Sequence, residues 1–136
     1  MRKRWVRRLI AAAILALGGC AASSQARTAS DRFHRLMDSG DYATIYDTST
    51  RGFKAAVSRD VWIAFLTRIN RKMGSCEAAP ATFGGMQVST TGTFVTTVSS
   101  RRCKNGKLNE RFVWLVVGDS VGLLKYNGSS PLLLTD

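Results

Sequence analysis

The chain has 136 residues, and its 20 Lys and Arg against 9 Asp and Glu give a formal net charge of +11. This length suits one domain with a single hydrophobic core. One His and three Cys without local ligand spacing exclude a structural zinc site, and we expect no cofactor.

The first twenty residues have the pattern of an export signal. They start with the basic segment 2–8, continue through an apolar run from Leu9 to Leu17 and end on Gly18-Gly19-Cys20. A basic start, an apolar stretch and a small-residue exit are typical of secretory signals. The apolar run is far shorter than the roughly 20 residues of a membrane-spanning helix. The sequence therefore predicts export.

The end of this segment, Leu17-Gly18-Gly19-Cys20, resembles the lipobox of bacterial lipoproteins. The resemblance implies that the Cys20 thiol carries a diacylglyceryl group, that the chain is cut just before it and that the new amino terminus is acylated. Two or more acyl chains anchor a protein stably to a membrane. In Gram-negative lipoproteins an Asp after the cysteine favours the inner membrane, so Ala21 implies the outer membrane.

The resemblance implies that residues 1–19 form a signal peptide that is removed and that Cys20 carries lipid. The small and polar composition of the following residues predicts a flexible tether, so that residues 20–29 form the lipidated cysteine and tether. Residues 30–136 are expected to form a single α+β domain, from the helix and strand patterns of that segment. The alternatives are an ordinary signal peptide cut after Ala22 and a twin-arginine signal at Arg7-Arg8.

Export also determines the expected partners. Without residues 1–19, 15 basic and 9 acidic residues remain, which gives a net charge of +6. Besides the membrane that holds the lipid, such a domain favours anionic lipid heads, acidic cell-wall polymers or an envelope protein. Nucleic acid is a poor candidate partner in the cell envelope.

Two cysteines remain once Cys20 is assigned to lipid, namely Cys76 and Cys103. In an oxidising compartment paired cysteines tend to form disulfides, so the sequence predicts a bond between them. The alternative is two unpaired thiols.

Helical periodicity dominates the first half of the domain. A helix is predicted from about Ala29 to Ser39, with Phe33 on its apolar face, and Asp41 caps a second, short helix. His34 lies beside the apolar stripe and is interpreted as an ordinary helix residue.

The strongest helical pattern of the chain lies in the segment before Gly74. Residues 51–57 are ambiguous, with Phe53 as their inward anchor, and Ser58 then caps a helix predicted over residues 59–73 and stopped by Gly74. Its apolar stripe is expected to pack in the core rather than line a ligand pocket, and consists of Val61, Trp62, Phe65, Leu66, Ile69 and Met73.

After Gly74, β-branched residues and tight turns predict an antiparallel meander of four to five strands. Asn105-Gly106 is the strongest hairpin signal. Helices first and strands second predict an α+β fold, with N-terminal helices packed on one face of a curved sheet. The predicted strands are Glu77–Ala81, weakened by Pro80, Thr82–Thr90 with a bend at Gly84-Gly85, Thr93–Cys103, Lys107–Val117 and Ser120–Asn127.

A diffuse set of residues is similar to a known family. The set is Gly40-Asp41-Tyr42, Ile45-Tyr46-Asp47, Ser49, Phe53-Lys54, Ser58, Trp62, Leu66, Ile69 and Met73-Gly74, followed by the meander. Over about residues 30–126 the chain resembles small bacterial envelope proteins with a cystatin-like or nuclear-transport-factor-2-like fold. The resemblance implies a cone of curved sheet against helices, which elsewhere serves both enzymes and binding or scaffold modules.

Catalysis inside such a cone needs an acid or a histidine with a shifted pKa. Glu110 is the first candidate, because it shares strand parity with Phe112, Trp114 and Val116. The residues at the alternate positions, from Arg111 onward, are nearly as apolar. Strand parity therefore does not determine which set of side chains is buried. The weaker candidates are Asp38 and Asp41. Turnover that survives the joint substitution of Glu110, His34, Tyr42 and Tyr46 would exclude catalysis in the cone.

The binding interpretation depends on a basic hairpin tip. Arg101, Arg102, Lys104 and Lys107 surround the predicted turn and form a candidate contact for an anionic surface. The alternative is a solvated tip that keeps a sheet edge from aggregating. The tail from Leu132 to Leu134 either docks on the domain or presents an apolar patch.

These patterns assign no catalytic, cofactor-binding or metal-binding residue. We therefore expect a lipid-anchored envelope protein that acts as a non-enzymatic binding or scaffold module. The alternative is an enzyme that binds a small molecule or transfers a proton in the interior of the cone.

Overall fold

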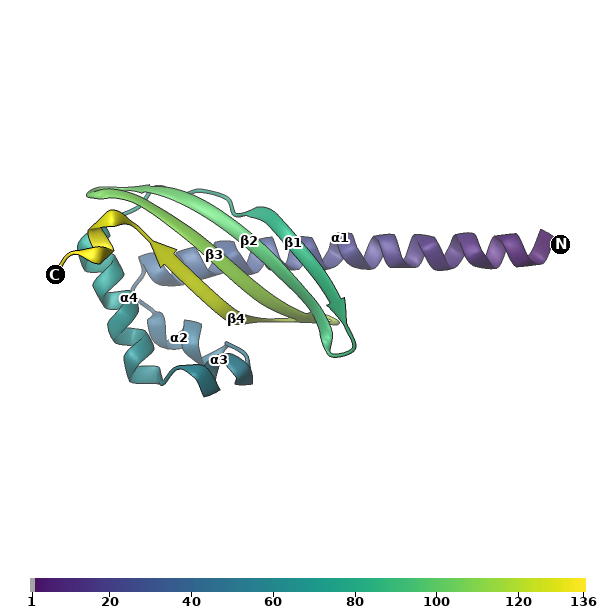
Figure 1. Ribbon diagram of the computed structural model, residues 1–136, viewed down its shortest axis with the longest axis horizontal. Helices are drawn as coiled ribbons and strands as arrows, with labels where there is room; N and C mark the ends of the chain where they lie inside the picture. Colours follow the sequence, from purple (N-terminus) through teal and green to yellow (C-terminus); the bar gives the residue numbers. More distant parts are fainter. Residues whose placement is uncertain (1) are drawn as a thin grey trace.

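The structure of the protein, a computed structural model, describes residues 2–136, with side chains from Cys20 onward. Met1 and the side chains of the signal-like segment up to residue 19 lie outside this description. The helices are α1 (Arg2–Asp38), α2 (Tyr42–Asp47), α3 (Arg51–Ala56), α4 (Arg59–Met73) and the 3-10 helix η1 (Pro131–Leu134). The strands are β1 (Thr82–Ser89), β2 (Gly92–Cys103), β3 (Gly106–Val117) and β4 (Ser120–Ser129). The predicted α+β class is confirmed (Figure 1).

The strands form one antiparallel sheet in the order β1-β2-β3-β4, as expected for a meander. A bulge between Phe83 and Gly85 produces the predicted bend in the first strand. The additional strand predicted over residues 77–81 is wrong, because the backbone there forms no strand. Pro80 lacks the N–H group that a strand ladder requires.

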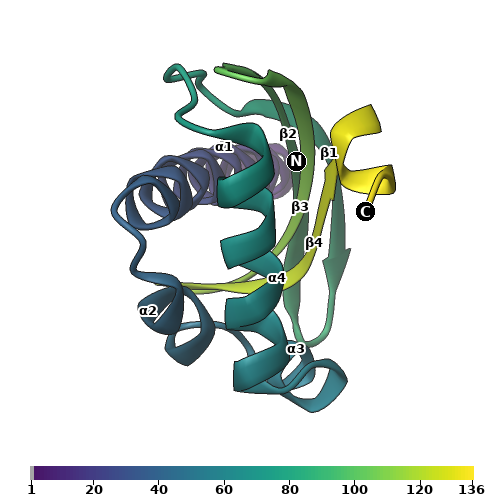
Figure 2. The same cartoon turned by 90° about the vertical axis from the view of Figure 1, so that its left-hand side faces the viewer.

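One face of the sheet is buried against the helices. Along β3, the side chains of Glu110, Phe112, Trp114 and Val116 are buried and alternate with more exposed neighbours. Helix α1 crosses this face, and α2 and α4 lie on the same side of the sheet (Figure 2). The sequence pattern leaves open which alternate side chains of β3 are buried. In the structure the buried set is the one that contains Glu110.

The short helices and α4 begin and end at their capping residues. Asp41, Thr50 and Ser58 precede α2, α3 and α4, and each side chain accepts a hydrogen bond from a backbone N–H three residues on. Gly74 ends α4 with a φ of +72°, a conformation that favours glycine. The ambiguous segment before α4 contains α3, and its Phe53 is buried as expected.

Helix α1 is longer than the sequence pattern predicts. Residues 20–29, expected as a flexible tether, are helical, and Ala22 and Ala26 are buried in the core. Alanine has the highest helix propensity and allows a helix to approach a sheet closely, yet it leaves no visible stripe of large apolar residues. The tether prediction is therefore wrong for this segment. Among residues 2–136, no helix has an apolar stretch suited to crossing a membrane.

Two members of the predicted α4 core stripe are exposed. Trp62, Leu66 and Ile69 are buried, whereas Val61 and Phe65 lie at the surface. These two side chains instead line a hollow of about 590 Å³ between α3, α4 and β4, which we name the second hollow. The apolar stripe is wider than the strip of α4 that the rest of the domain covers.

Candidate functional site

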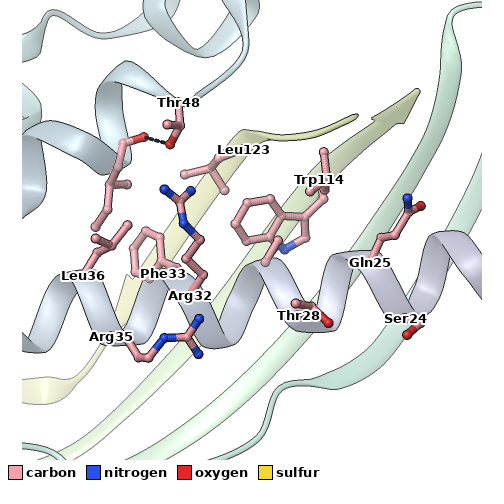
Figure 3. Close-up of a pocket in the computed structure, with 13 residues that line it drawn as sticks. Ser24, Gln25, Thr28, Arg32, Phe33, Arg35, Leu36, Thr48, Trp114 and Leu123 are labelled. Atoms are coloured by element: carbon pink, nitrogen blue, oxygen red, sulfur yellow. Dashed lines mark hydrogen bonds between the residues drawn. The ribbon is translucent and has the colours of Figure 1, made fainter. Parts of the chain in front are cut away.

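A hollow of about 300 Å³ lies where α1, α2 and the β3–β4 hairpin meet (Figure 3). Phe33, Trp114 and Leu123 contribute apolar surface to this α1 hollow, while the exposed Arg32 and Arg35 flank it. No acidic side chain of the described residues lines it. An apolar interior beside two cations suits a ligand that has an apolar body and a negative charge.

Hydrogen bonds to two buried side chains hold the Trp114 ring in this hollow. Its Nε1–H lies 3.0 Å from Ser30 Oγ and 3.1 Å from Thr97 Oγ1, and those two hydroxyls are 2.7 Å apart. All three side chains are buried, so the hydrogen bonds fix the indole against the sheet. The α1 hollow therefore has a rigid wall before any ligand arrives.

Four polar side chains meet in the core, and we name Glu110, His34, Ser99 and Tyr126 the Glu110 cluster. Glu110 Oε1 lies 2.8 Å from His34 Nε2 and accepts a hydrogen bond of 3.0 Å from Ser99 Oγ. Glu110 Oε2 accepts a hydrogen bond of 2.7 Å from the Tyr126 hydroxyl. The Glu110 side chain has no exposed surface, and both of its oxygens have the partners that a buried carboxylate requires.

The Glu110 carboxylate of the cluster is ionised at neutral pH. Burial raises the pKa of Glu110, but the hydrogen bonds and charge of its partners outweigh burial, and the pKa lies below its ordinary value. Burial, and then the neighbouring Glu110 charge and hydrogen bond, raise the pKa of Tyr126 well above its ordinary value. At pH 7 Glu110 is thus an ionised, weak base, and Tyr126 is a neutral donor.

The cluster contains two of the residues considered from the sequence. Glu110 is buried, and His34 is its direct partner rather than the ordinary helix residue that the sequence pattern suggested. Ser99 and Tyr126 are the members that sequence reasoning missed. Strand register is the signal that could have found Ser99, since it lies directly opposite Glu110 in the β2–β3 pairing.

The other catalytic candidates have structural roles outside the cluster. Asp38 forms an ion pair with Arg101, and Asp41 caps α2. The Tyr42 hydroxyl accepts a hydrogen bond of 2.8 Å from the side chain of Asn70. The Tyr46 hydroxyl donates to the backbone carbonyl of Val57 at 2.9 Å.

Arg101 does not belong to the exposed basic tip. Its side chain is 1% exposed, and its Nη2 donates to both carboxylate oxygens of Asp38, at 2.9 and 3.0 Å. Arg101 has the inward parity of β2, so it ties the sheet to the end of α1 and is unavailable to an external anion. The exposed tip consists of Arg102, Lys104 and Lys107.

The cysteines fall into two groups. Cys76 and Cys103 form the predicted disulfide, which joins the segment after α4 to the end of β2. Cys20 is an exposed free thiol on α1. Within the described residues, no three His, Cys, Asp or Glu side chains are grouped so that they could hold a metal ion.

The chain was also compared with known proteins. Neither the protein-family models nor the curated protein sequences contain a match to it.

Proposed function

We propose that the protein is a lipid-anchored component of the bacterial cell envelope, in which a cystatin-like or nuclear-transport-factor-2-like cone acts as a non-enzymatic binding module. The lipid is attached at Cys20, and the outer membrane is the favoured location. The observation that carries the binding role is the α1 hollow, because it combines apolar walls with two arginines and no carboxylate. Its ligand is an anionic amphipathic small molecule.

The two arginines give the hollow its preference for charge. Arg32 and Arg35 are three residues apart on α1, so their side chains project from neighbouring positions on one face of the helix. A carboxylate or phosphate between them accepts charge-assisted hydrogen bonds, while the apolar part of the ligand covers Trp114 and Leu123. A neutral molecule of the same shape gains only the apolar contact with Trp114 and Leu123.

Dodecanoate is the probe for this site, and dodecanol is its uncharged counterpart. We expect calorimetric titration below the micellar concentration to show binding of dodecanoate and much weaker binding of dodecanol. The double variant Arg32→Gln/Arg35→Gln is expected to lower dodecanoate affinity about tenfold or more, since each charge-assisted hydrogen bond is worth about 1.5 to 3 kcal/mol.

The matched control removes two other cations. Arg111 and Lys125 line the second hollow beside α4, so Arg111→Gln/Lys125→Gln is expected to leave dodecanoate affinity unchanged. Equal affinities of the native protein and the Arg32/Arg35 variant would contradict the assignment of the α1 hollow. A loss confined to the Arg111/Lys125 variant would move the site to the second hollow.

The lipid attachment is tested by intact-mass analysis of protein isolated from membranes. The expected mass is that of a chain starting at Cys20 with acyl groups added. Cys20→Ala is expected to abolish the acyl mass, whereas Ser24→Ala, one helical turn further on, is expected to retain it. An unacylated native chain, or one that keeps residues 1–19, would contradict the proposal.

The second candidate function is proton transfer on a small molecule. The observation that favours it is the Glu110 cluster, because a buried carboxylate paired with a histidine is a common acid–base arrangement. The binding function is better supported, since the Glu110 side chain has no exposed surface and its lowered pKa makes it a weak base. A substrate would have to displace the partners of Glu110 to reach it.

A further inference from the structure

Helix α1 connects Cys20 rigidly to the folded domain. Ala22 and Ala26 pack in the core, and the side chain of Gln25 donates a hydrogen bond of 3.1 Å to the Gly118 carbonyl in the β3–β4 turn. Cys20 lies five positions before Gln25 on this helix, which is about 7.5 Å of axial rise. A lipid on Cys20 therefore holds this end of the sheet beside the membrane, with no flexible linker between them.

Two hairpin turns lie together at this end of the molecule. The β1–β2 turn (residues 89–92) and the β3–β4 turn (residues 117–120) are in contact, because Val117 and the Val116 carbonyl lie against Gly92. A Cβ atom at Gly92 would come within 2.7 Å of that carbonyl, so only glycine fits there. Figure 1 shows both turns at the end of the sheet past which the N-terminal part of α1 extends.

Each of these turns has one exposed apolar side chain at its border. Val88 and Val117, which border the two turns, are 74% and 52% exposed. The turns themselves consist of Ser, Thr and Gly residues together with Asp119, which are small enough to let the two valines reach a membrane surface. Exposed valines at two adjacent tips are costly in water, but they gain free energy when they enter the interface of a bilayer.

We propose that these two turns form a docking surface for the phospholipid bilayer that holds the lipid anchor. This inference rests on the proposed acylation of Cys20, and adds that the acyl chains and the two valines contact the same membrane. The domain then stands with its strands directed away from the bilayer, and its orientation is fixed rather than free.

In this orientation the basic hairpin tip lies at the end of the domain that faces away from the membrane. Arg102, Lys104 and Lys107 lie at the other end of β2, a strand of 12 residues that spans roughly 40 Å. Electrostatic attraction falls off over about 8 Å at physiological ionic strength. The exposed tip therefore faces away from the anchoring membrane and makes no contact with its head groups.

Single added cysteines test this orientation. In the acylated protein the Cys20 thiol carries lipid, and Cys76 and Cys103 are bonded to each other, so a new cysteine is the reactive thiol. The variants Val88→Cys and Val117→Cys probe the docking surface. Leu134→Cys is the matched control, because Leu134 is an apolar residue, 88% exposed, beside the opposite end of the sheet.

Each variant is reconstituted into vesicles of phosphatidylethanolamine and phosphatidylglycerol and treated with a membrane-impermeant maleimide. The same substitutions in a Cys20→Ala background give the intrinsic reactivity of each site without lipid. We expect the reaction at positions 88 and 117 to slow about tenfold or more in the vesicles, and that at position 134 to stay unchanged.

The outcomes separate the two proposals. Equal reactivity at all three positions, in protein whose intact mass includes the acyl groups, overturns the docking surface and leaves the lipid anchor in place. Slowing at position 134 alone overturns the orientation and places the opposite end on the bilayer. An unacylated mass overturns the anchor and the docking surface together.

Discussion

Replacing Glu110 by alanine is expected to lower the free energy of unfolding by about 3 to 5 kcal/mol, because it removes one member of a buried pair and strands its partners. His34 and Ser99 lose their acceptor, and the hydroxyl of the partly buried Tyr126 loses its own. Urea denaturation at neutral pH measures the change. The matched control is Glu77→Ala at the other glutamate of the chain, which is exposed and is expected to change stability by less than about 0.5 kcal/mol.

The dependence of this effect on pH distinguishes a charged Glu110 from a mere space filler. Its folded-state pKa lies below the ordinary value, so its contribution is complete above the unfolded pKa, about 4.3, and is lost as pH falls through the folded pKa. The difference in unfolding free energy between native protein and Glu110→Gln should therefore shrink on acidification from pH 5. A difference that stays constant down to pH 2 would show that Glu110 carries no charge in the fold.

Removing the disulfide is expected to have an effect of similar size. The bond closes a loop between positions 27 residues apart, and loop closure of this length is worth about 3 to 4 kcal/mol in the chain-entropy model. The double variant Cys76→Ser/Cys103→Ser should unfold at correspondingly lower urea concentration. Reductant should shift the native protein to the same midpoint and leave the double variant unchanged. A native midpoint that is insensitive to reductant would contradict a contribution from this bond.

Local signals predicted most of the element boundaries. Ser58 and Gly74 bracket α4 because a side-chain acceptor at one end and a glycine at the other are local requirements of a helix. The strands from Thr82 onward could be predicted from the sequence equally well, because β-branched runs alternate with glycine-containing turns. Such signals act over a few residues, so no tertiary information is needed to interpret them.

The Glu110 cluster could not be assembled from the sequence, because its members are brought together by register and helix placement. The predicted turn at Asn105-Gly106 lies one residue beyond the observed turn, in which Cys103 pairs with Gly106. That shift is enough to place Arg101, rather than Ser99, opposite Glu110. The contact with His34 further depends on where α1 crosses the sheet, which no local pattern encodes.

The position of α1 at the start of the chain has a consequence for the order of folding. Its buried partners come much later, since Ser30 meets Trp114 84 residues downstream and His34 meets Glu110 76 residues downstream. During synthesis this helix stays without its sheet until nearly the whole polypeptide has been made, and contacts of such long sequence separation form slowly. The domain therefore cannot complete its core until the last strands have been synthesised.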